Sequence, residues 1–332
     1  MVRCDFFLHV QYMKLFGYPK LGAQYTPYPI NGKSSWSSRA AMPLTPTQKQ
    51  SNFTTVVPGL SKVVCIAFDN NQNLYISCDG SPNQLLKYNS SFQKQPFVSD
   101  DAWVGGTAGT LPVAMAFNES YSALYVVNFA SNNLTRINMS DFSYLQVNLT
   151  GQGGNSGVGY RLNAPNGLTF DATYSYLVAT NVTDSNLVQI VLNGSGTSGV
   201  VGPFCPSAPF TQPVLVTNDA NNNFYVSNLN TNQIFVVTST TYSVLASLTL
   251  PRGVSFNTNN YNYLWATSSG SDTPVASINV SDPSSVQMYK DPLFNNPRGI
   301  VFDANNYMYV ANFGSGGANT ASILKSKQPV FI

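Results

Sequence analysis

Six copies of one short motif, repeated at regular intervals, predict that this chain folds as a six-bladed β-propeller of four-stranded blades. Each copy joins a strand of alternating apolar residues to a second strand through a tight turn rich in Asp and Asn. Consecutive copies lie 38 to 53 residues apart, a spacing that suits one four-stranded blade. We therefore predict a propeller over residues 51–332 and a non-repeating, extended N-terminal arm over residues 1–50.

The six copies are read in chain order. The first is IAFDNNQNLYISC, from Ile66 to Cys78, and the later ones begin at Met115, Leu168, Leu215, Val254 and Ile300. All but the first carry a proline five residues before the Phe position, at Pro112, Pro165, Pro213, Pro251 and Pro297. A third strand is expected after each copy, at Gln84–Tyr88, Leu134–Asn138, Leu187–Val191, Gln233–Val237, Val275–Val280 and Ser322–Lys325.

The turn inside each copy carries short polar side chains. The carboxylates at the start of four of these turns are Asp69, Asp171, Asp219 and Asp303. Side chains of this kind accept hydrogen bonds from backbone N–H groups a few residues further along the chain. We therefore expect these four carboxylates to stabilise the turns rather than to form a ligand site.

Two segments resemble the NHL repeat. PRGVSF begins at Pro251, and PRGIVFDANNYMYVAN begins at Pro297; the repeat pattern reads Pro-x-Gly-Ile-Ala-Val-Asp, a turn, then Tyr-Val-Ala-Asp or Asn. The similarity covers about residues 58–327, although the first copy lacks the proline and Asn218 replaces the Phe of the fourth copy. The resemblance implies a six-bladed propeller related in fold to the senescence-marker and lactonase-like propellers. NHL propellers include protein- and RNA-binding platforms and related propellers include lactonases and lyases, so the resemblance implies no single activity.

A propeller must close its ring, because an open edge strand invites pairing with other chains. Phe53–Val57 precedes the first copy and could supply the outer strand of the last blade, while Gln328–Ile332 is the competing candidate. The arm contains five prolines. It could pack on the propeller or extend toward a partner, and the sequence leaves both alternatives open.

The candidate binding site lies at one mouth of the central channel, where the innermost strand of each blade begins and the next strand ends. The residues expected to end the second strands there are Asn128, Asn181, Asn228 and Asn312, with Cys78 and Ser268 in the other two blades. The positions after the opening prolines add Asn166, Arg252 and Arg298. The asparagines either cap strand ends through local hydrogen bonds, or they line a polar mouth in which the two arginines grip a carboxylate or another planar anion. Phe129 and Phe313 could add a stacking surface.

The repeats supply few catalytic groups. The only histidine of the chain is His9, in the arm, and the only glutamate is Glu119, in a turn on the opposite face. Neither a His-based general base, nor a histidine zinc site, nor a Ser-His-Asp triad can be built within the propeller. Asp79, Asp184 and Asp272 lie in loops beyond the mouth and are the candidate metal ligands, because Ca²⁺ accepts Asn and Asp oxygens. No other cofactor is expected.

The four cysteines do not form a disulfide framework. Cys65 and Cys78 lie on neighbouring predicted strands, but the alternation of side chains puts them on opposite faces. A bridge between them needs a slip in register, so buried free thiols are the expected state.

Composition narrows the range of partners. Only 9% of the residues are charged, the net charge is +2, and six of the sixteen basic residues lie within the arm. The repeats have no basic stripe, which argues against nucleic-acid binding. No stretch approaches the ~18 apolar residues that a membrane span needs, and polar residues interrupt the first 17 residues too often for a signal peptide. The low charge favours an extracellular or surface protein but leaves the location open.

These observations favour a non-catalytic propeller that presents its channel mouth to a protein, a glycan or a small anionic ligand. The alternative is a divalent-metal-dependent lactonase, other hydrolase or lyase of the propeller class. A second alternative is a structural component of a larger assembly, for which the low charge and the arm would serve packing.

Overall fold

The computed structural model describes residues 51–80, 82–98, 110–151, 159–257, 260–269 and 274–330. The chain divides into two compact units, Met1–Gln48 and Lys49–Ile332. The first unit lies outside the described residues, so the extended arm stays a prediction. No helix long and apolar enough to cross a membrane occurs in the described ranges.

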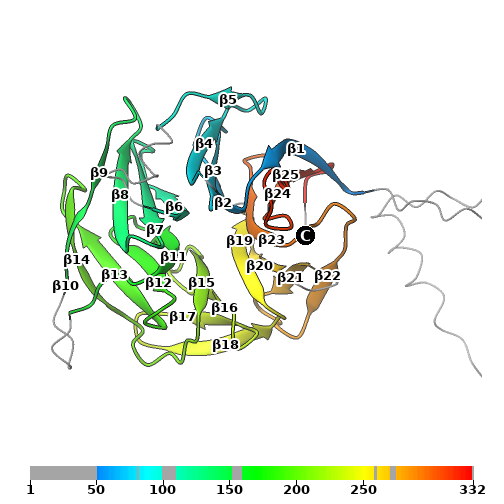
Figure 1. Cartoon of the computed structure of the whole chain (residues 1–332). Coiled ribbons are helices and arrows are strands. Elements are labelled where there is room, and N and C mark those ends of the chain that lie inside the picture. Colours follow the sequence, from blue (N-terminus) through cyan, green and yellow to red (C-terminus); the bar gives the residue numbers. More distant parts are fainter. Residues whose placement is uncertain are drawn as a thin grey trace, which may run out of the picture. The chain divides into compact units, whose positions relative to one another are not determined.

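The second unit is a ring of six antiparallel sheets (Figure 1), which confirms the predicted six-bladed β-propeller. The innermost strands contact one another in the cyclic order β2, β6, β11, β15, β19, β23 and back to β2. The first blade consists of β2 (Val63–Phe68), β3 (Leu74–Cys78), β4 (Gln84–Tyr88) and β5 (Lys94–Gln95). The second consists of β6 (Pro112–Phe117), β7 (Ala123–Asn128), β8 (Asn133–Asn138) and β9 (Tyr144–Gln146).

The third blade has five strands rather than four. It contains β11 (Pro165–Phe170), β12 (Leu177–Asn181), β13 (Asn186–Leu192) and β14 (Ser198–Phe204). A short strand, β10 (Asn148–Gly151), adds in parallel to the outer edge of β14. The chain leaving the second blade thus covers an edge that would otherwise be exposed.

The last three blades complete the ring. The fourth contains β15 (Pro213–Asn218), β16 (Phe224–Asn228), β17 (Gln233–Val237) and β18 (Tyr242–Ser247). The fifth contains β19 (Pro251–Asn257), β20 (Asn260–Ser268), β21 (Val275–Asn279) and β22 (Val286–Tyr289). The sixth contains β23 (Pro297–Phe302), β24 (Met308–Asn312), β25 (Ala321–Ser326) and β1 (Phe53–Leu60).

Strand β1 closes the ring. It pairs antiparallel with β25, and Phe53 lies opposite Ser326. This confirms Phe53–Val57 as the closing segment, extended to Leu60, whereas residues 328–330 of the competing segment form no strand. The first and last parts of the propeller therefore share one sheet, a non-local pairing that holds the ring shut.

Three turns repeat one arrangement around a buried carboxylate. In the first of them, Asp69 Oδ1 accepts bonds from the backbone N–H groups of Asn71 and Asn73, at 2.9 and 2.8 Å. Its other oxygen accepts a bond from the Tyr75 hydroxyl at 3.0 Å. Asp219 with Tyr225 and Asp303 with Tyr309 repeat this hydroxyl bond at 3.2 and 3.0 Å. The structural role predicted for these carboxylates is confirmed.

The thiols are free, as predicted. Cys65 lies opposite Ser77, and Cys78 lies opposite Val63, so the two cysteines are not paired across the strands. Cys65, Cys78 and Cys205 are all unbridged; Cys65 is half-buried, and the other two are buried.

Candidate functional site

Most strand-end residues of the predicted ring are buried and bond the loop that leads into their own blade. Asn181 accepts a bond from the Asn163 N–H at 3.0 Å and donates to the Arg161 carbonyl at 2.8 Å. Asn312 does the same with the Asn295 N–H and the Leu293 carbonyl, at 3.1 and 2.7 Å.

The other ring positions follow this pattern with variations. Asn228 accepts a bond from the Thr211 N–H at 2.9 Å. The Ser268 hydroxyl donates to the Thr249 carbonyl. Asn128 is fully buried and donates to Asn133 and Thr135, at 2.7 and 3.0 Å. These bonds match the strand-capping interpretation of the asparagines, and contact between the ring and a ligand stays a prediction.

A hydroxyl one residue before the strand end joins neighbouring blades. In the fifth blade, the Thr267 hydroxyl accepts a bond from the Gly253 N–H at 2.7 Å and donates to the Arg298 carbonyl of the sixth blade at 2.6 Å. Gly253 lies in an irregular part of the β19–β20 pairing, so its N–H has no partner in the ladder. The hydroxyl therefore satisfies two buried backbone groups and fixes the backbone of Arg298.

The same arrangement occurs in three other blades. Ser77, Thr180 and Ser227 donate to the carbonyls of Val113, Val214 and Arg252, at 2.8, 2.6 and 2.6 Å. The backbones of both mouth arginines are thus held from the preceding blade. The sequence signal is a Ser or Thr directly before the ring position, and our sequence reasoning did not use it.

Glycine after each arginine permits this close approach of the inner strands. A Cβ built on Gly253 would lie 2.1 Å from the Arg298 carbonyl oxygen and 2.9 Å from the Thr267 hydroxyl. A Cβ on Gly299 would lie 3.1 Å from the Val64 carbonyl oxygen of the first blade. The Pro-Arg-Gly sequence therefore puts each arginine at the seam between two blades, where a side chain has no room at Gly253 and little room at Gly299.

Arg252 and Arg298 are half-buried, and neither forms an ion pair with a carboxylate of the described residues. Within the described ranges there is one ion pair, in which Lys325 Nζ lies 3.9 Å from Asp303 Oδ2. Burial lowers the pKa of Arg252. The pKa of Arg298 is lowered to about 10, mainly by burial and also by the charge of Arg252, while the charge of Asp79 opposes the shift. Two like charges thus share one poorly solvated mouth, where Asp79 offsets part of the charge of Arg298 without forming an ion pair at 4.0 Å or less.

An aromatic ring holds the Arg298 side chain, which makes no hydrogen bond to the described residues. Its guanidinium carbon lies 3.5 Å from the centroid of the Phe313 ring, in a stacked cation–π contact. Its Nε is buried and makes no hydrogen bond, and Asn166 Oδ1 is likewise buried without a partner. The structure thus brings Arg298 together with Phe313, the stacking residue that the sequence predicted.

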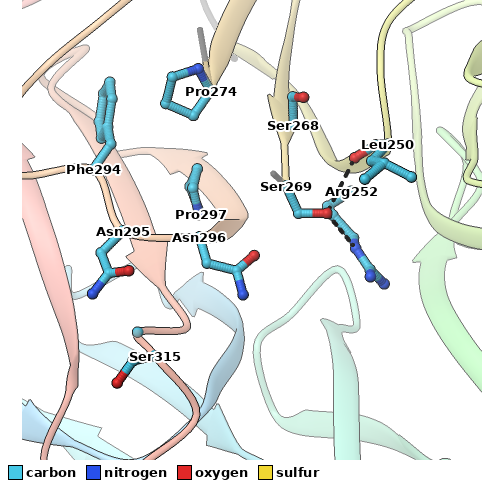
Figure 2. A pocket seen from close by; sticks show the side chains of 11 residues that line it. Leu250, Arg252, Ser268, Ser269, Pro274, Phe294, Asn295, Asn296, Pro297 and Ser315 are labelled. Atoms are coloured by element: carbon cyan, nitrogen blue, oxygen red, sulfur yellow. Dashed lines mark hydrogen bonds between the residues drawn. The ribbon is translucent and has the colours of Figure 1, made fainter. Parts of the chain in front are cut away.

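A hollow of about 580 Å³ opens beside Arg252 between the fifth and sixth blades. Figure 2 shows Ser269 between the Leu250 carbonyl and Arg252, whose Nε donates to the Ser269 hydroxyl at 3.1 Å. Asn296 and Ser315 line the hollow from the sixth blade. The sequence did not predict Asn296 and Ser315 as lining residues, because both are uncharged and neither occupies one of the repeat positions assigned to the mouth. Neutral hydrogen-bonding groups therefore surround the positive group.

The three candidate metal ligands differ in burial and in their hydrogen-bond partners. Asp79 is half-buried, and desolvation raises its pKa, although Lys62 and Arg298 oppose the shift. Asp184 is exposed and accepts a bond from the Asn163 amide at 2.6 Å. Asp272 lies outside the described residues. Over the described part of the chain, no three His, Cys, Asp or Glu side chains cluster in a way that could hold a metal ion.

No family model matches the sequence, and no curated protein shows a sequence match. Solved structures do match the fold. A gluconolactonase from Xanthomonas campestris superposes with a TM-score of 0.62 at 14% identity, over 82% of this chain and 89% of that chain. An auxiliary nutrient binding protein from Bacteroides thetaiotaomicron gives 0.60 at 11% identity, over 82% and 75%. A streptogramin B lyase gives 0.53 at 14% identity, over 80% and 78%. The shared feature is the propeller fold.

Proposed function

We propose that this propeller is a non-catalytic binding protein, and that Arg252 and Arg298 together bind a carboxylate or a similar planar anion at the channel mouth. The observation that carries the proposal is the state of Arg298. Its guanidinium is poorly solvated, lies close enough to Arg252 to be affected by its charge, and has no carboxylate within ion-pair distance among the described residues.

An anion bound at this mouth would offset the unfavourable free energy of the two partly buried arginine charges. Burial of a charge without a partner is unfavourable, and a second like charge adds to the cost. A carboxylate offers two acceptor oxygens in the geometry of a guanidinium fork, and such charge-assisted bonds are the stronger ones. The stacked Phe313 ring holds the guanidinium plane of Arg298 in place.

The anionic group could belong to a small molecule, a glycan or a protein. A nutrient-binding protein is among the structural neighbours, which gives a precedent for binding on this fold. A lactonase and a lyase are neighbours as well, so the metal-dependent enzyme remains the alternative.

The test is a calorimetric titration of the full chain with acetate, citrate and inorganic phosphate at low ionic strength. The variant Arg252→Ala/Arg298→Ala should lose binding of the carboxylate probes. Arg161→Ala is the matched control, because Arg161 is an exposed arginine that lines a different hollow between the second and third blades. Equal affinity in the wild type and the double variant would remove the arginines from the proposal. Binding that appears only with an added divalent ion would favour the enzyme.

A further inference from the structure

The opposite opening of the channel is bordered by the turns between the first and second strands of the blades. In these turns the residue three positions after the leading Asp or Asn has a left-handed backbone. Its N–H bonds the carbonyl of the leading residue at 3.0 to 3.2 Å. Gln72, Asn222 and Asn306 occupy this position with φ of 60, 62 and 64°. Asn is among the residue types that tolerate this conformation best.

In two blades the side chain at this position also joins neighbouring turns. Asn222 of the fourth blade accepts a bond from the Ala172 N–H of the third blade, at 2.6 Å. Gln72 of the first blade accepts one from the Ala304 N–H of the sixth, at 3.1 Å. An amide side chain here therefore suits the backbone and stabilises the contact between two blades.

The second and third blades depart from this pattern and carry tyrosines. Tyr121 and Tyr174 occupy the left-handed position with φ of 55 and 56°. A bulky side chain is unfavourable in this conformation. Among the described residues, neither tyrosine has an inter-blade hydrogen bond of the kind that Gln72 and Asn222 make. The two rings instead lean on Phe117 and Phe170, with centroids 5.3 and 5.5 Å apart.

Tyr174 remains 42% exposed despite this contact. The ring packing therefore offsets only part of the unfavourable backbone conformation and of the missing inter-blade hydrogen bond. Tyr261, the second residue of β20 in the fifth blade, is also 42% exposed and packs in the same way on Phe256, with ring centroids 5.3 Å apart. Three tyrosines thus follow the ends of three innermost strands, β6, β11 and β19, at the same opening.

A negative charge lies in one of the turns that carry these tyrosines. Glu119, the only glutamate of the chain, is exposed in the turn that carries Tyr121. Burial raises the pKa of Tyr174, and Tyr121, Glu119 and Tyr261 add to the rise, so each of these three groups lies within electrostatic range of Tyr174. The neighbouring turns contain the carboxylates Asp69, Asp171, Asp219 and Asp303, of which Asp303 is paired with Lys325 at 3.9 Å. The two arginines lie at the other mouth.

We propose that Tyr121, Tyr174, Tyr261 and Glu119 form a second binding site, which takes an organic ammonium group such as a quaternary amine or a methylated lysine side chain. The faces of the tyrosine rings attract a cation through their quadrupoles, and the carboxylate adds direct attraction. A neutral apolar group would gain the ring contact without the charge term. An anion would be repelled. This site is independent of the arginine mouth.

The variant Tyr174→Asn tests the proposal and separates it from a packing role. Asparagine suits the left-handed backbone and can accept a bond from the Glu119 N–H, as Asn222 does from the N–H of Ala172. We expect the variant to melt at the wild-type temperature or above it, and to bind tetramethylammonium at least about tenfold more weakly, which corresponds to about 1.4 kcal/mol. A lower melting temperature with unchanged binding would assign Tyr174 to packing and overturn the proposal.

The probe and the remaining variants complete the experiment. Tetramethylammonium is titrated into the full chain by NMR or calorimetry, with tert-butanol as a neutral probe of similar shape. Equal affinity for the two, or no binding of tetramethylammonium, overturns the proposal. The exposed Glu119→Gln should weaken cation binding about fivefold, or about 1 kcal/mol, without affecting folding. Tyr144→Ala, on the outer strand of the second blade, should change nothing. Choline and a trimethyl-lysine peptide, titrated in parallel, distinguish a small amine from a protein side chain as the source of the group.

Discussion

Replacing Thr267 with valine removes one hydroxyl and keeps the shape of a side chain that is fully buried. In the wild type this hydroxyl accepts a bond from the Gly253 N–H at 2.7 Å and donates to the Arg298 carbonyl at 2.6 Å. Valine can do neither, so one buried donor and one buried acceptor lose their partner at the seam between the fifth and sixth blades.

The expected cost follows from those two groups. Each buried polar group left without a partner costs about 1–3 kcal/mol, and partial relaxation of the strand end lowers the sum, so we expect a loss of about 2–4 kcal/mol. In a domain of this size each kcal/mol shifts the melting temperature by about 2 °C. The melting temperature should therefore fall by about 4–8 °C.

The assay is urea unfolding followed by circular dichroism, in which the midpoint should fall while the slope stays unchanged. Thr267→Ser is the control, because serine keeps the hydroxyl and loses only a methyl group. It should lie closer to the wild type than valine does. If Thr267→Val unfolds within about 0.5 kcal/mol of the wild type, the hydroxyl does not hold the seam and our reasoning about the fixed arginine backbone is wrong.

Two further predictions concern the mouth. Desolvation raises the pKa of Asp79, which interacts electrostatically with Arg298. As the pH is lowered, Asp79 therefore becomes protonated and loses its negative charge at a pH above the ordinary Asp pKa of about 3.9. Affinity for methanesulfonate, which stays ionised, should rise as the pH falls through this range, and Asp79→Asn should bind it tightly at every pH; a flat wild-type profile would contradict this. Gly253→Ala should destabilise the protein by about 1–3 kcal/mol through overpacking against the Arg298 carbonyl. Gly194→Ala, where a Cβ meets nothing within 4 Å, should be neutral in the same unfolding assay.

The blades and the closing strand could be predicted from the sequence because their signals are local. The prolines at Pro112, Pro165, Pro213, Pro251 and Pro297 each begin an innermost strand of the structure. The alternating apolar pattern predicted the strand pairs. The closing strand could be predicted because the segment beginning at Phe53 precedes the first copy, and the last blade needs an outer strand. Strand β10 could not be predicted in this way, because it pairs with an edge that the fold alone brings near it.

The candidate site was harder to predict because its contacts cross from one blade to the next. The partners of Ser227 and Thr267 lie 25 and 31 residues further along the chain. The sequence did not reveal that the buried amides of Asn181 and Asn312 turn toward their entry loops. The two arginines were found because charge is scarce in this chain, and a repeated Pro-Arg-Gly stands out against that background.

The central claim is that the buried charge of Arg298 binds anions and does not stabilise the fold by itself. The most direct measurement is the gain in unfolding free energy on adding citrate, compared between the wild type and Arg298→Met, which keeps an unbranched side chain beside Phe313. We predict a gain of about 2.7 kcal/mol for the wild type at 100 times the dissociation constant, and almost none for the variant. We also predict that the two proteins unfold with similar free energies when citrate is absent. An equal gain from citrate in both proteins, or a variant that is already strongly destabilised without it, would contradict the account.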